Sequence, residues 1–237
     1  MNLIRNGKVE GPPSDTLPEE KNDEFTGILK EIDALYNEKK YDEVINLALP
    51  HINNENKKRA LEMRSMAAIS YFYKEDYKNS LLHYEEILSQ VEKVNASTWF
   101  NVLMSAVFIK DMEKARNAFN KTMEIWNTDP NQHLTVHRIR FYYAQALKHI
   151  GLFNEALEQL EELKKTYIEF KITDDHFLYV RGVPFMPNFL DLAKEVFEGL
   201  NIDFPTSDWL MGLKEKVDKD GKEFIKSRYE NAKTVPD

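Results

Sequence analysis

Two histidines, His133 and His137, stand four residues apart and are the first candidates for chemistry in this sequence. On a helix this spacing places both imidazoles on one face, as in many pairs of zinc ligands. No glutamate adjoins His133 as the zinc-protease motif requires, and the chain has no cysteine that could complete a site. We therefore expect a solvated pair at a helix start and no bound metal.

A second candidate is the segment KVDKDGKEF, which resembles part of a calcium-binding loop at Asp218, Asp220 and Gly221. The first and last ligand positions of such a loop require carboxylates. Lys216 and Ser227 occupy these two positions here. We therefore do not expect the segment to bind calcium.

A third candidate is the segment DDHF, which places Asp174 two residues before His176. A catalytic site would also need a nucleophile. The sequence contains no nucleophile elbow, phosphate loop or dinucleotide-binding motif. A turn is the simpler interpretation, so we expect no catalytic residues and no cofactor. An enzyme whose site lies in the C-terminal region, in a polar cleft lined by Asp174, His176 and Arg181, stays open as an alternative.

Composition narrows the possible partners and the location. The formal net charge is -8 and no dense basic run occurs, which disfavours nucleic acid because an acidic surface repels phosphates. The sequence has no run of 18 apolar residues, no apolar secretion signal and no cysteine. These features predict a cytoplasmic protein that does not associate with membranes.

Periodic apolar residues indicate which elements would position a binding surface. Between residues 25 and 168, apolar side chains recur at steps of three and four, which is typical of helices. Short polar breaks interrupt the pattern, and the first apolar residues after the breaks are Tyr41, Tyr77, Met112 and Phe153. Their separations of 36, 35 and 41 residues predict an all-α array of four helical hairpins.

The array resembles the tetratricopeptide repeat (TPR) family, whose repeat has about 34 residues. In the segment AISYFYKEDYKNSLLHYEEIL, four residues match the small and aromatic positions of that repeat: Ala68, Tyr71, Ser80 and Tyr84. The segment GLFNEALEQLEEL, which begins at Gly151, is the best single match. The resemblance covers residues 25–168 and implies a right-handed solenoid of helical hairpins.

The resemblance is degenerate, because Ile32 and Leu103 stand where the family has a small residue. An unrelated bundle of helical hairpins is one alternative. The pentatricopeptide family has a similar period, but it binds RNA through a basic groove, which the acidic composition does not suggest.

Three segments are expected along the chain. Residues 1–22 form an N-terminal arm with turn-forming and charged residues, and residues 23–170 form the repeat domain of four hairpins. After Phe170 the period is lost, so residues 171–237 are expected to form a helical cap that shields the end of the array.

Within this cap the stretch KITDDHFLYVRGVPFMPNF reads as irregular. A helix is predicted from Pro187 to Leu200, since proline favours the first turn of a helix. Thr206 or Ser207 is predicted to cap the next helix, and a polar helix through KEFIKSRYENA follows.

In TPR proteins the first helix of each repeat lines a concave groove. Carried over to this chain, the resemblance implies a groove that is apolar and aromatic at its middle. A carboxylate clamp is not expected, because only Asn101 and Lys148 supply suitable side chains. The predicted groove residues are Ile69, Phe72, Tyr73, Phe100, Asn101, Met104, Phe108, Phe141, Gln145 and Lys148.

In the alternative interpretation, the repeat register differs by one residue and the same predicted groove residues pack between helices. If the side chains do line a groove, an apolar segment should cover it, either from a partner or from this chain. The predicted function is a non-catalytic adaptor or regulator that binds a protein or peptide. An immunity or antitoxin-type inhibitor of another protein, with a basic partner, is the narrower alternative. The oligomeric state is left open.

Overall fold

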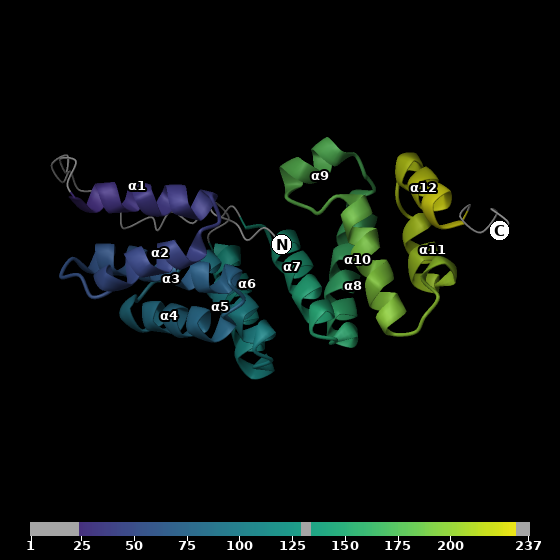
Figure 1. The fold of residues 1–237 in the computed structure, drawn as a ribbon. Coiled ribbons are helices and arrows are strands. Elements are labelled where there is room, and N and C mark those ends of the chain that lie inside the picture. The colour runs from purple at the N-terminus through teal and green to yellow at the C-terminus, as the bar shows by residue number, and fades with distance from the viewer. Residues whose placement is uncertain (1–23, 129–133, 231–237) are drawn as a thin grey trace. The chain divides into compact units, whose positions relative to one another are not determined.

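The computed structural model describes residues 24–128 and 134–230, and every regular element within them is a helix (Figure 1). The prediction of an all-α protein is therefore confirmed for this part of the chain. The predicted arm at residues 1–22 lies outside the described residues, as do His133 and residues 231–237. The chain divides into two compact units, residues 1–133 (unit 1) and residues 134–237 (unit 2).

Unit 1 is a series of helices in which each one contacts the next along the chain. The helices that follow the first three polar breaks begin at Tyr41, Tyr77 and Met112, as the spacing predicts. The elements of unit 1 are α1 (Glu24–Asn37), α2 (Tyr41–Ala48), η1 (Leu49–His51), α3 (Lys57–Tyr73), α4 (Tyr77–Gln90), α5 (Ala96–Phe108) and α6 (Met112–Thr128).

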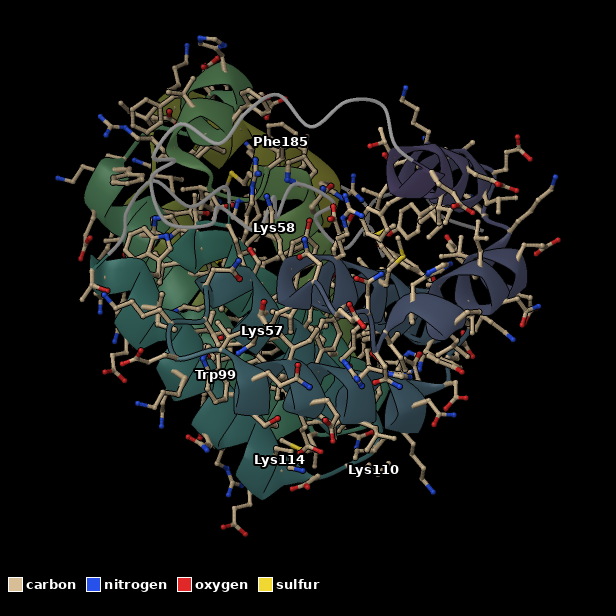
Figure 2. The ribbon with its side chains drawn as sticks, turned by 90° about the vertical axis from the view of Figure 1, so that its left-hand side faces the viewer. Lys57, Lys58, Trp99, Lys110, Lys114 and Phe185 are labelled. Carbon is tan, nitrogen blue, oxygen red and sulfur yellow. The ribbon has the colours of Figure 1, made fainter. Side chains whose placement is uncertain are left out.

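A left-handed residue ends the first helix of each hairpin in unit 1. Lys39, Glu75 and Lys110 have φ values of 59°, 62° and 64°, and each stands two residues before the start of the second helix. Figure 2 labels Lys110 at the turn between α5 and α6. In each turn the amide that follows the left-handed residue donates to a carbonyl five residues back: Lys40 to Leu35 at 2.9 Å, Asp76 to Tyr71 at 3.0 Å and Asp111 to Ala106 at 2.9 Å. Together with a second, shorter-range bond, this is the Schellman motif that closes a helix C-terminus.

Ring stacks at these turns join neighbouring hairpins. The first residue of α2, Tyr41, stacks on Tyr73 of α3 with ring centroids 5.2 Å apart and planes 12° apart. The first residue of α4, Tyr77, stacks in the same way on Phe108 of α5 at 4.4 Å and 15°. The two stacks are equivalent, and the tyrosines that form them, Tyr41 and Tyr77, stand 36 residues apart.

Small residues allow the helices of unit 1 to approach closely. Ala67 and Ala68 of α3 and Ala115 of α6 are fully buried, as expected for the small positions of the pattern. Ser80 of α4 and Ser105 of α5 are also fully buried, and their hydroxyl oxygens lie 3.0 Å apart in a hydrogen bond that satisfies both groups.

Unit 2 begins with the fourth predicted hairpin, whose second helix starts at Phe153 after the left-handed Gly151. Proline stands in the first turn of α10, and Ser207 caps α11 by accepting from the Leu210 amide at 3.2 Å, as predicted. The elements are α7 (Val136–His149), α8 (Phe153–Phe170), α9 (Asp175–Arg181), α10 (Met186–Gly199), η2 (Phe204–Thr206), α11 (Asp208–Lys214), α12 (Lys219–Ile225) and η3 (Lys226–Glu230).

An aromatic cluster holds unit 2 together. Tyr167 of α8 stacks on Phe189 of α10 at 4.6 Å, and Phe189 lies 5.6 Å from the ring of Trp209 in α11. Phe204 of η2 contacts both Trp209 and Tyr229. Since α8 contacts α10 and α11, the fourth hairpin belongs to the same compact unit as the C-terminal helices.

The connection between α8 and α10 also differs from expectation, because the stretch predicted to be irregular contains α9. Asp174 caps this helix by accepting from the Phe177 amide at 2.8 Å, and Gly182 ends it with a φ of 64°. Figure 1 shows α9 at the end of α8 and α10 where these two helices are connected. The segment is short, and its polar N-terminal residues hide the helical period.

The left-handed turns generate a prediction about stability. Replacing Glu75 or Lys110 with Gly should raise the free energy of unfolding by about 0.5–1 kcal/mol. The reason is that a non-glycine residue at positive φ costs about 1–2 kcal/mol, which exceeds the entropy that glycine adds to the unfolded chain. Urea denaturation of each variant measures the change.

Gly151→Ala is the matched control, since Gly151 has a φ of 83° and a Cβ added there would meet no atom within 4 Å. This variant should lose about 1 kcal/mol through backbone strain alone. Equal stability of Glu75→Gly, Lys110→Gly and the unchanged protein would contradict the turn argument.

Candidate interaction surface

The three groups considered for chemistry have structural roles in the described chain. His137 packs edge-on against Phe170 at 6.2 Å, and its Nδ1 lies 3.4 Å from the Thr166 hydroxyl. Asp174 is the cap of α9. Within residues 24–128 and 134–230, no three or more His, Asp or Glu side chains lie close enough together to share a metal ion.

Asp218, the first acidic residue of the calcium-like segment, ties the start of α12 to the segment before α9. Its carboxylate accepts from the amide and hydroxyl of Thr173 at 2.8 and 2.6 Å, and from the Gly221 amide at 2.9 Å. Partial burial acts to raise the pKa of Asp218, but these hydrogen bonds together outweigh it and lower the pKa below its usual value. The carboxylate therefore serves as a structural acceptor.

The predicted groove residues of unit 1 fall into a buried set and a half-buried set. Phe72, Phe100 and Met104 are buried. Phe72 contacts Tyr77 and Phe108 with ring centroids 5.1 and 5.7 Å apart, so it packs between neighbouring hairpins. The half-buried set consists of Ile69, Tyr73, Asn101 and Phe108.

The half-buried set lies on two neighbouring first helices. Ile69 and Tyr73 are four residues apart on α3, and Asn101 and Phe108 are seven residues apart on α5, so each pair shares one face of its helix. Ring contacts of Phe72 with both Tyr73 and Phe108 connect the C-terminal ends of α3 and α5. We call Ile69, Tyr73, Asn101 and Phe108 the α3–α5 face.

The other three predicted residues lie on α7 in unit 2. Phe141 is buried, and Gln145 is half-buried. The Lys148 ammonium forms an ion pair with Glu195 of α10, so this side chain links two helices of the unit.

A hydrogen bond fixes the α3–α5 face to the helix behind it. The Asn101 amide nitrogen donates to the hydroxyl of Tyr84 on α4 at 2.9 Å. Tyr84 is fully buried, and burial raises its pKa well above the usual range. The bond satisfies a buried hydroxyl and orients the Asn101 amide at the same time.

Unit 1 contains a buried polar pair that the sequence did not predict. Arg64 of α3 and His83 of α4 are both buried, and His83 stacks on Tyr71 at 5.5 Å. Arg64 donates to the Ile52 carbonyl at 3.4 Å. Burial, with a smaller contribution from the Arg64 charge, lowers the pKa of His83 below its ordinary value of 6.5. No motif marks this pair, because Arg64 and His83 lie on different helices and 19 residues apart.

No protein-family model matches the chain, and no curated protein matches it either. No helix among the described residues is both long enough and apolar enough to span a bilayer.

The bond between Tyr84 and Asn101 predicts a non-additive pair of substitutions. Asn101→Ala should lower the free energy of unfolding by about 1–3 kcal/mol, because it leaves the buried Tyr84 hydroxyl without its partner. Tyr84→Phe should cost only about 1 kcal/mol, since the half-buried Asn101 amide can still reach water.

The double variant Asn101→Ala/Tyr84→Phe should be no less stable than Asn101→Ala alone. Urea denaturation of the four proteins completes a double-mutant cycle. Strictly additive losses would show that the hydrogen bond does not couple the two residues.

His83 predicts a dependence of stability on pH. Its pKa is lower in the folded chain than in the unfolded chain, so the unfolded chain binds more protons at pH values below the unfolded pKa of about 6.5. This contribution is therefore fully present above pH 6.5 and is lost as the pH falls toward the folded pKa.

His83→Phe keeps a ring beside Tyr71 but cannot be protonated. The loss of unfolding free energy between pH 7.5 and 5.5, measured by denaturation at each pH, should be smaller in this variant. His137, whose pKa is also lowered by burial, provides a parallel contribution in unit 2 and is left unchanged as the reference. An identical pH dependence of His83→Phe and the unchanged protein would contradict the assignment.

Proposed function

We propose that this chain is a non-catalytic interaction module that binds a protein or peptide segment along the α3–α5 face. The proposal includes a TPR-like right-handed solenoid of hairpins, ended by a C-terminal helical cap. Supporting features are the left-handed turns of unit 1, which recur 36 and 35 residues apart in the chain, and the two equivalent ring stacks beside them.

One observation carries the binding proposal. Ile69, Tyr73, Asn101 and Phe108 are half-buried on two successive first helices, and the Phe72 ring contacts both Tyr73 and Phe108. The inner sides of Ile69 and Tyr73 pack against the core of α1, α2 and α3. Tyr and Asn combine an apolar or aromatic surface with hydrogen-bonding groups, which suits recognition of an extended or helical segment. Because Phe72, Phe100 and Met104 are buried, we assign them to the support of this face rather than to contact with the partner.

The charge of the chain suggests what kind of partner would bind. With a formal net charge of -8, the chain attracts basic proteins more strongly than acidic ones. We therefore propose a basic protein or peptide as the partner and a cytoplasmic location for the complex. The association should weaken as ionic strength rises, because salt screens attraction between exposed charges.

A site-specific cross-linking experiment tests the proposal. The photoreactive amino acid p-benzoylphenylalanine is placed at Tyr73, where an aromatic ring already stands, and the protein is irradiated in the cells that produce it. Leu82 is the matched control, because it is 53% exposed on the next helix, α4, and is not part of the α3–α5 face. We expect one recurring polypeptide to be cross-linked through position 73 and not through position 82.

Circular dichroism and thermal melting of both photoreactive variants verify that each one is folded. The cross-linked polypeptide is identified by mass spectrometry, and its capture is repeated at low and high salt. Equal cross-linking from positions 73 and 82, or none from position 73, would argue against the α3–α5 face as the binding site.

A further inference from the structure

A carboxylate without a partner lies on α3 beside the residues of the α3–α5 face. Glu62 precedes Ile69 by seven residues and Tyr73 by eleven, so the three side chains share one face of the helix, and all three are half-buried. Within the described residues the Glu62 carboxylate makes no hydrogen bond and no ion pair. A half-buried carboxylate in this situation is unfavourable, because its charge is partly removed from water without compensation.

The basic residues nearest to Glu62 along α3 do not neutralise it. The Arg59 guanidinium, one turn earlier, lies over the Phe25 ring of α1, with its central carbon 4.6 Å from the ring centroid. Lys58, four residues before Glu62 and labelled in Figure 2, attracts the carboxylate but does not form an ion pair with it. Burial, together with the Asp33 carboxylate of α1, outweighs this attraction and raises the pKa of Glu62 above its usual value.

The neighbouring hairpins of unit 1 supply no cation at the equivalent positions. Glu62 stands 13 residues before the left-handed residue of its hairpin. The same position is Thr26 in the hairpin of α1 and Ser97 in the hairpin of α5, and neither side chain carries a charge. Glu62 is therefore the one charged side chain at this position of the three hairpins.

The surroundings of Glu62 suit the cationic end of a long side chain. Met66 follows Glu62 by one turn, is also half-buried and packs against the core of α1, α2 and α3. A lysine or arginine of a bound segment can lay its methylene groups along such an apolar surface and place its charge at the carboxylate. The resulting charge-assisted hydrogen bond compensates a carboxylate that the chain itself leaves unpaired.

We propose that Glu62 determines the specificity of the α3–α5 face by pairing with a lysine or arginine side chain of the bound segment. This inference rests on the proposed function, because it takes the α3–α5 face as the binding site. It assigns the preference for a basic partner to one contact rather than to the net charge of the chain. A segment with a neutral or acidic residue at that position binds weakly, since Glu62 then stays half-buried without a partner.

Peptide selection on the full chain tests the inference with a defined probe. A phage-displayed library of random peptides is selected on the unchanged protein and, in parallel, on Glu62→Lys. The enriched peptides are synthesised, and those that cross-link through p-benzoylphenylalanine at position 73 are retained, because they bind the α3–α5 face. Peptides retained from the unchanged protein should share a lysine or arginine, and those retained from Glu62→Lys should share an aspartate or glutamate.

Dissociation constants of the retained peptides measure the contact itself. Glu62→Gln should raise the dissociation constant of a peptide selected on the unchanged protein by about tenfold or more, because a hydrogen bond between charged groups is lost. Exchanging the shared basic residue of that peptide for glutamate should restore its binding to Glu62→Lys. Glu113→Gln is the matched control and should leave the constant unchanged, because Glu113 is exposed on α6, a second helix.

Thermal melting separates recognition from a structural role. Since the Glu62 carboxylate has no hydrogen-bond partner in the described part of the chain, Glu62→Gln should not lower the melting temperature.

A marked loss of stability in Glu62→Gln would overturn this inference and leave the proposed function standing. The same holds for retained peptides whose charge and affinity do not depend on residue 62. Recovery of no peptide that cross-links through position 73 would instead overturn the proposed function, and this inference with it.

Discussion

The left-handed residue that ends the first helix of each hairpin is the constraint on which the rest of unit 1 depends. At Lys39, Glu75 and Lys110 the positive φ reverses the chain, and the second helix begins two residues later. The position of the first residue of that helix is therefore fixed relative to the helix before it. At two of the three turns this residue is a tyrosine, Tyr41 or Tyr77, whose ring reaches the next hairpin.

The left-handed turn within each hairpin and the ring stack to the next hairpin together explain how neighbouring hairpins are positioned relative to one another. Each stack joins the start of one second helix to the end of the following first helix, so the contacts extend only to the neighbouring hairpin. In the proposed repeat array, stability would be close to a sum of hairpin terms and nearest-neighbour terms. The buried Ser80–Ser105 hydrogen bond and the small Ala67, Ala68 and Ala115 side chains supply further neighbour contacts of the same kind.

The starts of the second helices were predictable because each polar break, and the apolar residue that follows it, can be seen in the sequence. The direction in which each apolar side chain points was harder to predict from the sequence. In α5 the consecutive residues Val102, Leu103 and Met104 are all buried, so this helix has no single apolar stripe from which a groove could be distinguished from packing. The helix α9 was missed because its exposed Tyr179 and Val180 do not follow the rule that apolar residues point inward. The pair Arg64 and His83 has no sequence signal, since only the packing of α3 against α4 brings the two side chains together.

The aromatic residues of the α3–α5 face pack between neighbouring hairpins, which limits how much of each ring a partner can contact. One side of the Tyr73 ring stacks on Tyr41 and one side of the Phe108 ring stacks on Tyr77, so only the remaining, partly exposed parts of these rings can contact a partner. A segment that inserted deeply between them would have to separate neighbouring hairpins and lose the stacks. In the proposed function, a partner segment would therefore lie across the edges of the rings, and the Asn101 amide, held by Tyr84, would be the polar group that sets its register.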